Sequence, residues 1–98
     1  MEPWRALLQG IIETVCSRED LDPAQSKVDL RFLVKNDVRC ALEIAVNGPR
    51  RMRPTAVWSW SDSKVLYYDS AGKRWKEDPT ESGVVAPPNL LEIWGKNG

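Results

Sequence analysis

The sequence contains no histidine, and this absence limits the chemistry that its 98 residues can perform. Histidine is the commonest general base near neutral pH and the commonest protein ligand of metal ions. The six glycines are scattered at turns and form no phosphate-binding loop. Two separated cysteines without a histidine do not make a zinc site. We therefore expect no catalytic residue, no metal site and no cofactor, and so a protein that is not an enzyme.

Long apolar segments are also missing from the chain. No apolar run approaches the ~20 residues that a membrane-spanning helix needs, and the N-terminus lacks the pattern of a signal peptide. The two cysteines, Cys16 and Cys40, fall at apolar positions, which favours buried reduced thiols, with a disulfide between them as the alternative. We expect a cytoplasmic protein that does not bind membranes.

The charges cancel in total but are unevenly distributed along the chain. Fourteen basic and fourteen acidic residues give a net charge of zero. Residues 47–76, however, carry seven basic and two acidic groups, while both flanking segments are net acidic. The length suits one domain, spanning residues 1–98, and the five tryptophans supply apolar surface to bury.

The N-terminal segment has the periodicity of an amphipathic helix. Its apolar residues recur every three or four positions and form one stripe. They are Trp4, Leu7, Leu8, Ile11, Ile12, Val15 and Cys16. Pro3 suits the first turn of a helix, and Asp20, Asp22 and Pro23 suit its end. The pattern predicts a helix over residues 3–18.

Residues 27–46 instead alternate between apolar and polar, which predicts two antiparallel strands with one apolar face each. Residues directly opposite in such a pair share a face. A two-residue loop would place Val34 opposite Arg39, whereas a three-residue loop, residues 35–37, places it opposite Val38. We therefore expect the three-residue loop.

Three further strands are predicted over residues 55–61, 65–69 and 73–77, separated by turn sequences. In the last turn, Gly72 stands where a positive φ is needed. If residues 70–72 form that loop, Tyr67 lies opposite Trp75 and Tyr68 lies opposite Arg74.

The last part of the chain, residues 89–95, has the start and stop signals of a short helix, with a sixth strand as the alternative. The whole pattern predicts an α+β fold. In it, an N-terminal helix packs on an antiparallel meander sheet of about five strands, and a short C-terminal helix follows.

Two groups of residues are candidates for a binding site. The first is the loop that carries Arg50, Arg51 and Arg53 between two prolines, which could hold phosphates or an acidic protein surface. The second is an aromatic set on the predicted strands. Its members are Trp58, Trp60, Tyr68 and Trp75, with Arg74 beside them. One helix covers only one face of a sheet, so we expect at least one pair, Trp58/Trp60 or Tyr68/Trp75, to be exposed.

These residue types are the ones that dominate protein–protein interfaces. The sequence therefore favours a protein-interaction module, such as an adaptor, an inhibitor or a subunit, that binds another protein or a second copy of itself. The alternative is a nucleic-acid-binding domain with arginines on phosphates and aromatic rings on bases. Zero net charge and a pI of about 6.2 favour the first hypothesis.

Overall fold

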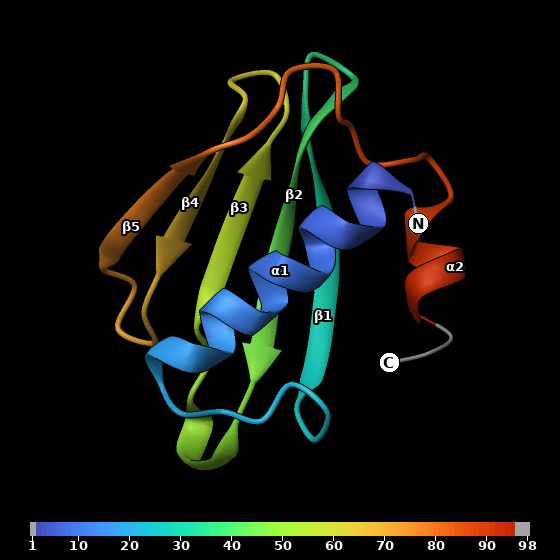
Figure 1. Ribbon diagram of the computed structural model, residues 1–98. Helices are drawn as coiled ribbons and strands as arrows, with labels where there is room; N and C mark the ends of the chain where they lie inside the picture. Colours follow the sequence, from blue (N-terminus) through green and yellow to red (C-terminus); the bar gives the residue numbers. More distant parts are fainter. Residues whose placement is uncertain (1, 96–98) are drawn as a thin grey trace.

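The computed structural model describes residues 2–95 and has the predicted α+β architecture (Figure 1). Its elements in chain order are α1 (Pro3–Arg18), β1 (Lys27–Lys35), β2 (Val38–Asn47), a 3₁₀ turn η1 (Pro49–Arg51), β3 (Thr55–Ser59), β4 (Lys64–Tyr68), β5 (Arg74–Pro79) and α2 (Leu90–Gly95). The five strands form one antiparallel sheet in the order β1-β2-β3-β4-β5, so each strand pairs with its neighbours in sequence. Neither helix has the length and apolarity to cross a membrane within residues 2–95.

Helix α1 has the predicted bounds. Pro3 occupies its first turn, where a missing N–H costs no hydrogen bond. The helix ends because Asp20 adopts a left-handed conformation with a φ of 56°, and the N–H of Leu21 then closes the last turn by donating to the Cys16 carbonyl at 2.9 Å. Only the apolar stripe of α1 faces the sheet.

The core lies between α1 and one face of the sheet (Figure 1). The stripe of α1 meets apolar residues that alternate along the strands, and all of them are buried. From the sheet these are Leu42, Ile44, Val46, Ala56, Trp58, Val65 and Tyr67. Burying each large apolar side chain contributes roughly 1.5–3 kcal/mol, so this layer is the main source of stability.

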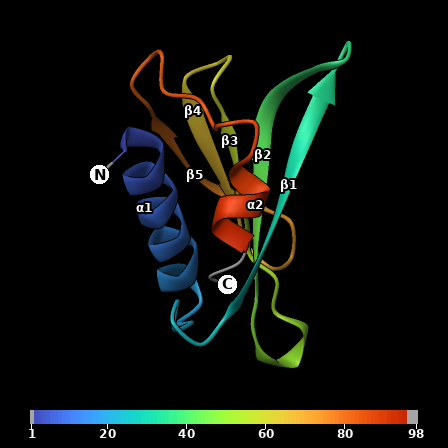
Figure 2. The same ribbon diagram turned by 90° about the vertical axis from the view of Figure 1, so that its right-hand side faces the viewer.

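Helix α2 is the predicted C-terminal helix, and it closes the core beside β1 on the same side as α1 (Figure 2). Its Leu90 is fully buried, and the Trp94 ring packs edge-on against Trp4 at 6.4 Å between centroids. The Arg5 guanidinium lies over both indole rings. The alternative of a sixth strand is therefore wrong.

The expected three-residue loop between the first two strands is also wrong. Asn36 and Asp37 form a two-residue turn with φ values of 52° and 64°, and Val34 does lie opposite Arg39. A bulge at Cys40 restores the pairing of apolar with apolar residues over the rest of the two strands, away from the hairpin tip. The mismatch is tolerated because the hairpin tip extends past the core, where Val34 is 60% exposed.

A second bulge changes the expected pairing of the last two strands. Tyr68 lies opposite Arg74 as predicted, but Tyr67 lies opposite Lys76, and Trp75 is the extra residue of the bulge. The Trp75 ring still contacts Tyr67, at 5.7 Å between centroids. The loop between these strands is the predicted one, with Gly72 at a φ of 86°.

Candidate interaction surface

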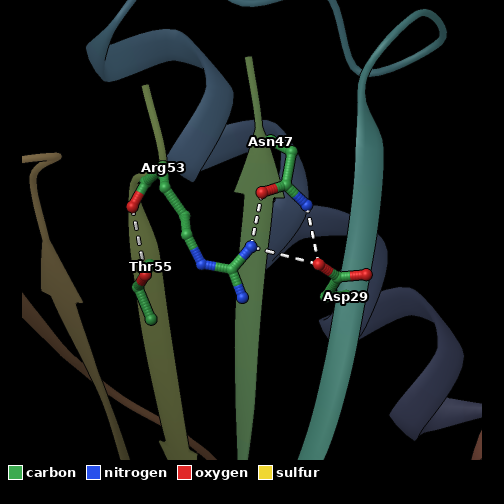
Figure 3. Close-up of polar contacts among 4 residues, drawn as sticks. All are labelled: Asp29, Asn47, Arg53 and Thr55. Carbon is green, nitrogen blue, oxygen red and sulfur yellow. Dashed lines mark hydrogen bonds and ion pairs between the residues drawn. The ribbon is translucent and has the colours of Figure 1, made fainter. Parts of the chain in front are cut away.

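No element within residues 2–95 covers the sheet face opposite α1, which we call the open face. Figure 3 shows part of it, with α1 behind the strands. Strand register places its side chains in three rows that run from β1 to β5. They are Asp29, Ala45, Thr55, Tyr68 and Arg74; then Arg31, Glu43, Val57, Leu66 and Glu77; then Leu33, Ala41, Ser59, Lys64 and Pro79.

The open face is apolar at its centre and charged at its two sides. Val57 and Leu66 are partly exposed in the middle row. On the β1 side, Arg31 pairs with Glu43 at 3.3 Å, and on the β5 side Arg74 pairs with Glu77 at 3.9 Å. A small apolar area between charged groups has the organisation of a protein–protein interface, which has an apolar core and a polar rim.

Arg53 is fixed at one end of this face rather than free in solution. Its Nη1 donates to Asp29 Oδ2 at 3.0 Å and also to Asn47 Oδ1 (Figure 3). The Asn47 amide donates to the same Asp29 oxygen at 2.7 Å. These three side chains join the loop before β3 to both β1 and β2, although Asp29 and Arg53 are 24 residues apart.

The backbone at Arg53 is held from the opposite side. Its N–H donates to Ser70 Oγ at 2.9 Å, and Ser70 in turn donates through both its hydroxyl and its N–H to the carboxylate of Glu19. Glu19 is the C-cap residue of α1, directly after Arg18. The arginine loop is therefore anchored to the end of α1, the β4–β5 loop and the first two strands.

The Asp29 contacts predict a specific dependence of stability on pH. Hydrogen bonds from Asn47 and Arg53 lower the pKa of Asp29 below its ordinary value. Stabilisation by this carboxylate is therefore fully present above the unfolded pKa of about 3.9 and is lost as the pH falls through the lower folded pKa.

Urea unfolding at a series of pH values tests this role of Asp29. Between pH 6 and 2, the free energy of unfolding of the wild type should fall more steeply than that of Asp29→Asn. The control Asp37→Asn, in the exposed hairpin turn, should follow the wild type; equal slopes for all three proteins contradict the role of Asp29.

Arg50 and Arg51 differ from Arg53 because both are exposed, and no hydrogen bond or ion pair from residues 2–95 holds their guanidinium groups. Their φ values are 57° and 64°, a conformation that long side chains rarely adopt. Hydrogen bonds between Gly48 and Met52 (2.9 Å) and between Met52 and Pro49 (3.0 Å) close the loop around them. A Cβ added at Gly48 would lie 2.7 Å from Leu21 Cδ2, so the Leu21 side chain would have to move. The loop therefore presents two arginines on a fixed backbone.

The three tryptophans of the predicted binding set lie on the side of the sheet that α1 covers. Trp58 is 0% exposed, so the expectation that it offers a binding surface is wrong. Trp60 is half-buried and packs edge-on against Trp58 and Phe32, and Trp75 is half-buried beneath the Arg18 guanidinium at 5.0 Å. Of the eight predicted residues, the structure places Tyr68 and Arg74 together on the open face, with Arg53 at its end.

The open face also contains residues that the sequence pattern did not indicate as a binding site. Thr55, Val57 and Leu66 occupy its centre, and Asp29 and Glu43 its charged side. The register of β2 with β3 decides which residues of β3 face α1, since a residue opposite Leu42 faces the helix with it. Trp58 is that residue, which leaves Val57 on the other face.

Three features of the described residues bear on catalysis: metal-ligand clusters, cysteines and cavities. No group of three Cys, Asp or Glu side chains within residues 2–95 could hold a metal ion. Both cysteines are unpaired, and burial, assisted by the charge of Asp22, raises the pKa of the Cys16 thiol, so it stays protonated. A cavity of about 370 Å³ beside the first turn of α1 is lined mainly by apolar side chains, and Glu81 is the titratable group among the described residues that line it.

Comparison with protein-family models, with curated proteins and with solved structures finds no match to this chain.

Proposed function

We propose that this chain is a non-enzymatic protein-interaction module, acting as an adaptor, an inhibitor or a subunit, and that the open face is its binding surface. One observation carries the proposal: a five-stranded sheet leaves one face without a covering layer in residues 2–95 while Val57, Leu66 and Tyr68 stand at its centre. Sheets with one uncovered face normally have polar residues there. Apolar and aromatic side chains at this position favour contact with another protein.

The edges of the sheet are less suited to binding than its face. On β5, Pro79 has no N–H to donate, and the bulge at Trp75 interrupts the strand. On the opposite edge, α2 lies beside β1 (Figure 2). An added strand from a partner would meet an obstacle at either edge, so the partner contacts the open face.

The arginine loop supplies a charged rim to this surface. Arg53 joins the loop to the β1 side of the open face, so Arg50 and Arg51 lie near the end of the first row. Rim charges mainly accelerate association and select partners, whereas the apolar centre determines the dissociation rate. We therefore assign the larger share of affinity to the centre and a smaller share to Arg50 and Arg51.

Nucleic-acid binding is a second candidate, because Arg50 and Arg51 are exposed and Tyr68 and Arg74 share the open face. Phosphate binding by lysines and arginines releases counterions, so affinity would fall steeply with salt. The carboxylates of Asp29, Glu43 and Glu77 on the same face disfavour this function, since they would repel phosphates.

A capture experiment from an extract of the native host tests the proposal. The tagged wild type should retain a protein partner after nuclease treatment. Val57→Asp should lose at least nine-tenths of it, because the substitution places a charge at the apolar centre. Ala6→Asp, on the exposed side of α1, is the matched control and should capture as the wild type does. The double variant Arg50→Glu with Arg51→Glu should fold normally and lose only part of the capture.

Two results would contradict the proposal. Equal capture by the wild type and Val57→Asp would exclude the open face as the binding surface. Loss of all captured material on nuclease treatment, together with a steep decrease as salt is raised, would favour the nucleic-acid function instead.

A further inference from the structure

The charges on the open face indicate which protein it binds. We propose, on the basis of the proposed function, that the partner is a second copy of this chain. The two open faces then pack against each other in a symmetric dimer whose two-fold axis runs parallel to β3. Closed two-fold dimers are the commonest protein assemblies, and their interface must be complementary to itself. The open face meets that condition in one orientation.

A two-fold axis along β3 keeps each row at its own level and reverses the order of the strands. β1 of one copy then faces β5 of the second copy, β2 faces β4, and β3 faces β3. Sheets that pack face to face keep their strands within about 30° of each other, so this correspondence survives the normal twist. The contacts can therefore be taken directly from the three rows.

Both charged sides of the open face find opposite charges in this arrangement. In the first row, Asp29 comes opposite Arg74 of the second copy. In the middle row, Arg31 comes opposite Glu77 of the second copy. The symmetry repeats each pair, which gives four pairs of opposite charge across the interface.

The centre of the face is also suited to self-association. Val57 lies on β3 in the middle row, so it meets Val57 of the second copy on the axis. In the first row, the large Tyr68 comes opposite the smallest side chain of that row, Ala45. By the same correspondence, Glu43 comes opposite Leu66 of the second copy, so the apolar contact of the middle row lies on the axis, at Val57.

The other aligned orientation is unfavourable. In this orientation the two-fold axis is perpendicular to the strands and passes along the middle row. Arg31, Glu43 and Glu77 would then each face their own counterpart in the second copy. Like charges directly opposite each other repel. The charge pattern therefore selects the axis along β3.

The existing ion pairs leave these groups free to add a second contact. Asp29 is 45% exposed, and its hydrogen bonds from Asn47 and Arg53 all reach Oδ2, so Oδ1 remains for another donor. Arg31 and Arg74 are 70% and 56% exposed. Each can keep its present partner and reach across the interface.

The footprint limits the affinity. Five strands spaced ~4.8 Å apart and five residues of ~3.3 Å each give a face of roughly 19 by 17 Å. This is well below the standard interface of about 800 Å² per partner, so we expect a weak, transient dimer.

Sedimentation equilibrium of the full chain, from about 1 to 300 μM, tests the dimer. The wild type should pass from monomer to dimer in this range. Arg31→Glu alone and Glu77→Arg alone should each weaken dimerisation at least tenfold, because each places like charges across the interface. An equimolar mixture of these two variants should dimerise again, because both pairs in the mixed dimer then have opposite charges. Lys73→Glu and Glu13→Arg make the same charge changes away from the open face and should behave as the wild type.

The outcomes separate this inference from the proposed function. A wild type that stays monomeric at 300 μM, or a mixture that fails to dimerise, overturns the second copy as partner. If Val57→Asp still abolishes capture of a different protein in that case, the open face remains a protein-binding surface. If Val57→Asp changes neither capture nor association, both proposals fail.

Discussion

Ile11→Asp should leave the chain unfolded at 25 °C. Ile11 is 1% exposed at the centre of the α1 stripe and packs in the single core cluster of the described residues. Truncating such a side chain alone costs about 2–5 kcal/mol, and burying an unpaired carboxylate adds several kcal/mol more. A domain of this length has a free energy of unfolding of roughly 5–15 kcal/mol, so the substitution removes most or all of it.

Far-UV circular dichroism and urea unfolding measure this effect directly. Ile11→Asp should lose both the native spectrum and the cooperative transition. Gln9→Asp introduces the same side chain on the solvent side of α1 and should cost under about 1 kcal/mol. A cooperative transition for Ile11→Asp close to that of Gln9→Asp would show that the helix contributes little to the fold, contrary to the packing.

The helix and the strand order could be predicted from the sequence because each depends on a local pattern. The α1 stripe repeats every three or four residues for four turns, and Pro3 and Asp20 mark its ends. The meander follows from short connections, which place consecutive strands side by side. Both features are determined by residues within a few positions of one another.

The two bulges were not predicted because they depend on contacts between strands. The alternation around Cys40 and Trp75 fits both a regular pair and a bulged pair, and only the position of the core decides between them. At the hairpin tip no core is present, so the turn preference of Asn36 and Asp37 determines the loop length.

The candidate site was only partly predictable for a related reason. Seven residues, 48–54, separate β2 from β3, so the sequence does not fix their register or which side of β3 faces α1. The aromatic residues were therefore assigned to a binding surface although Trp58 belongs to the core. The partner of Arg53 was equally hidden, since Asp29 lies on another strand and only the completed sheet brings them together.

Trp58→Ala should be among the most destabilising single substitutions in the sheet. Comparing its loss of stability with its effect on affinity would show whether Trp58 acts in core packing or in binding. Trp58 is 0% exposed and contacts Trp60 at 5.4 Å between ring centroids. Removing a buried tryptophan costs about 3–5 kcal/mol, because a cavity remains in a close-packed core. The urea midpoint should fall accordingly, while any protein still folded should bind its partner with unchanged affinity.

Trp58→Phe is the informative companion, because the indole Nε1 of Trp58 is buried without a hydrogen-bond partner among the described residues. A buried unpaired donor costs about 1–3 kcal/mol, and phenylalanine lacks it. That gain offsets part of the packing lost with the smaller ring, so Trp58→Phe should lie within about 1.5 kcal/mol of the wild type in free energy of unfolding. Affinity for the partner should be measured at a concentration of denaturant where each variant is fully folded. If both variants bind the partner more weakly than the wild type does, Trp58 belongs to the binding surface. Unchanged affinity with a large loss of stability only in Trp58→Ala would place its whole effect in the core.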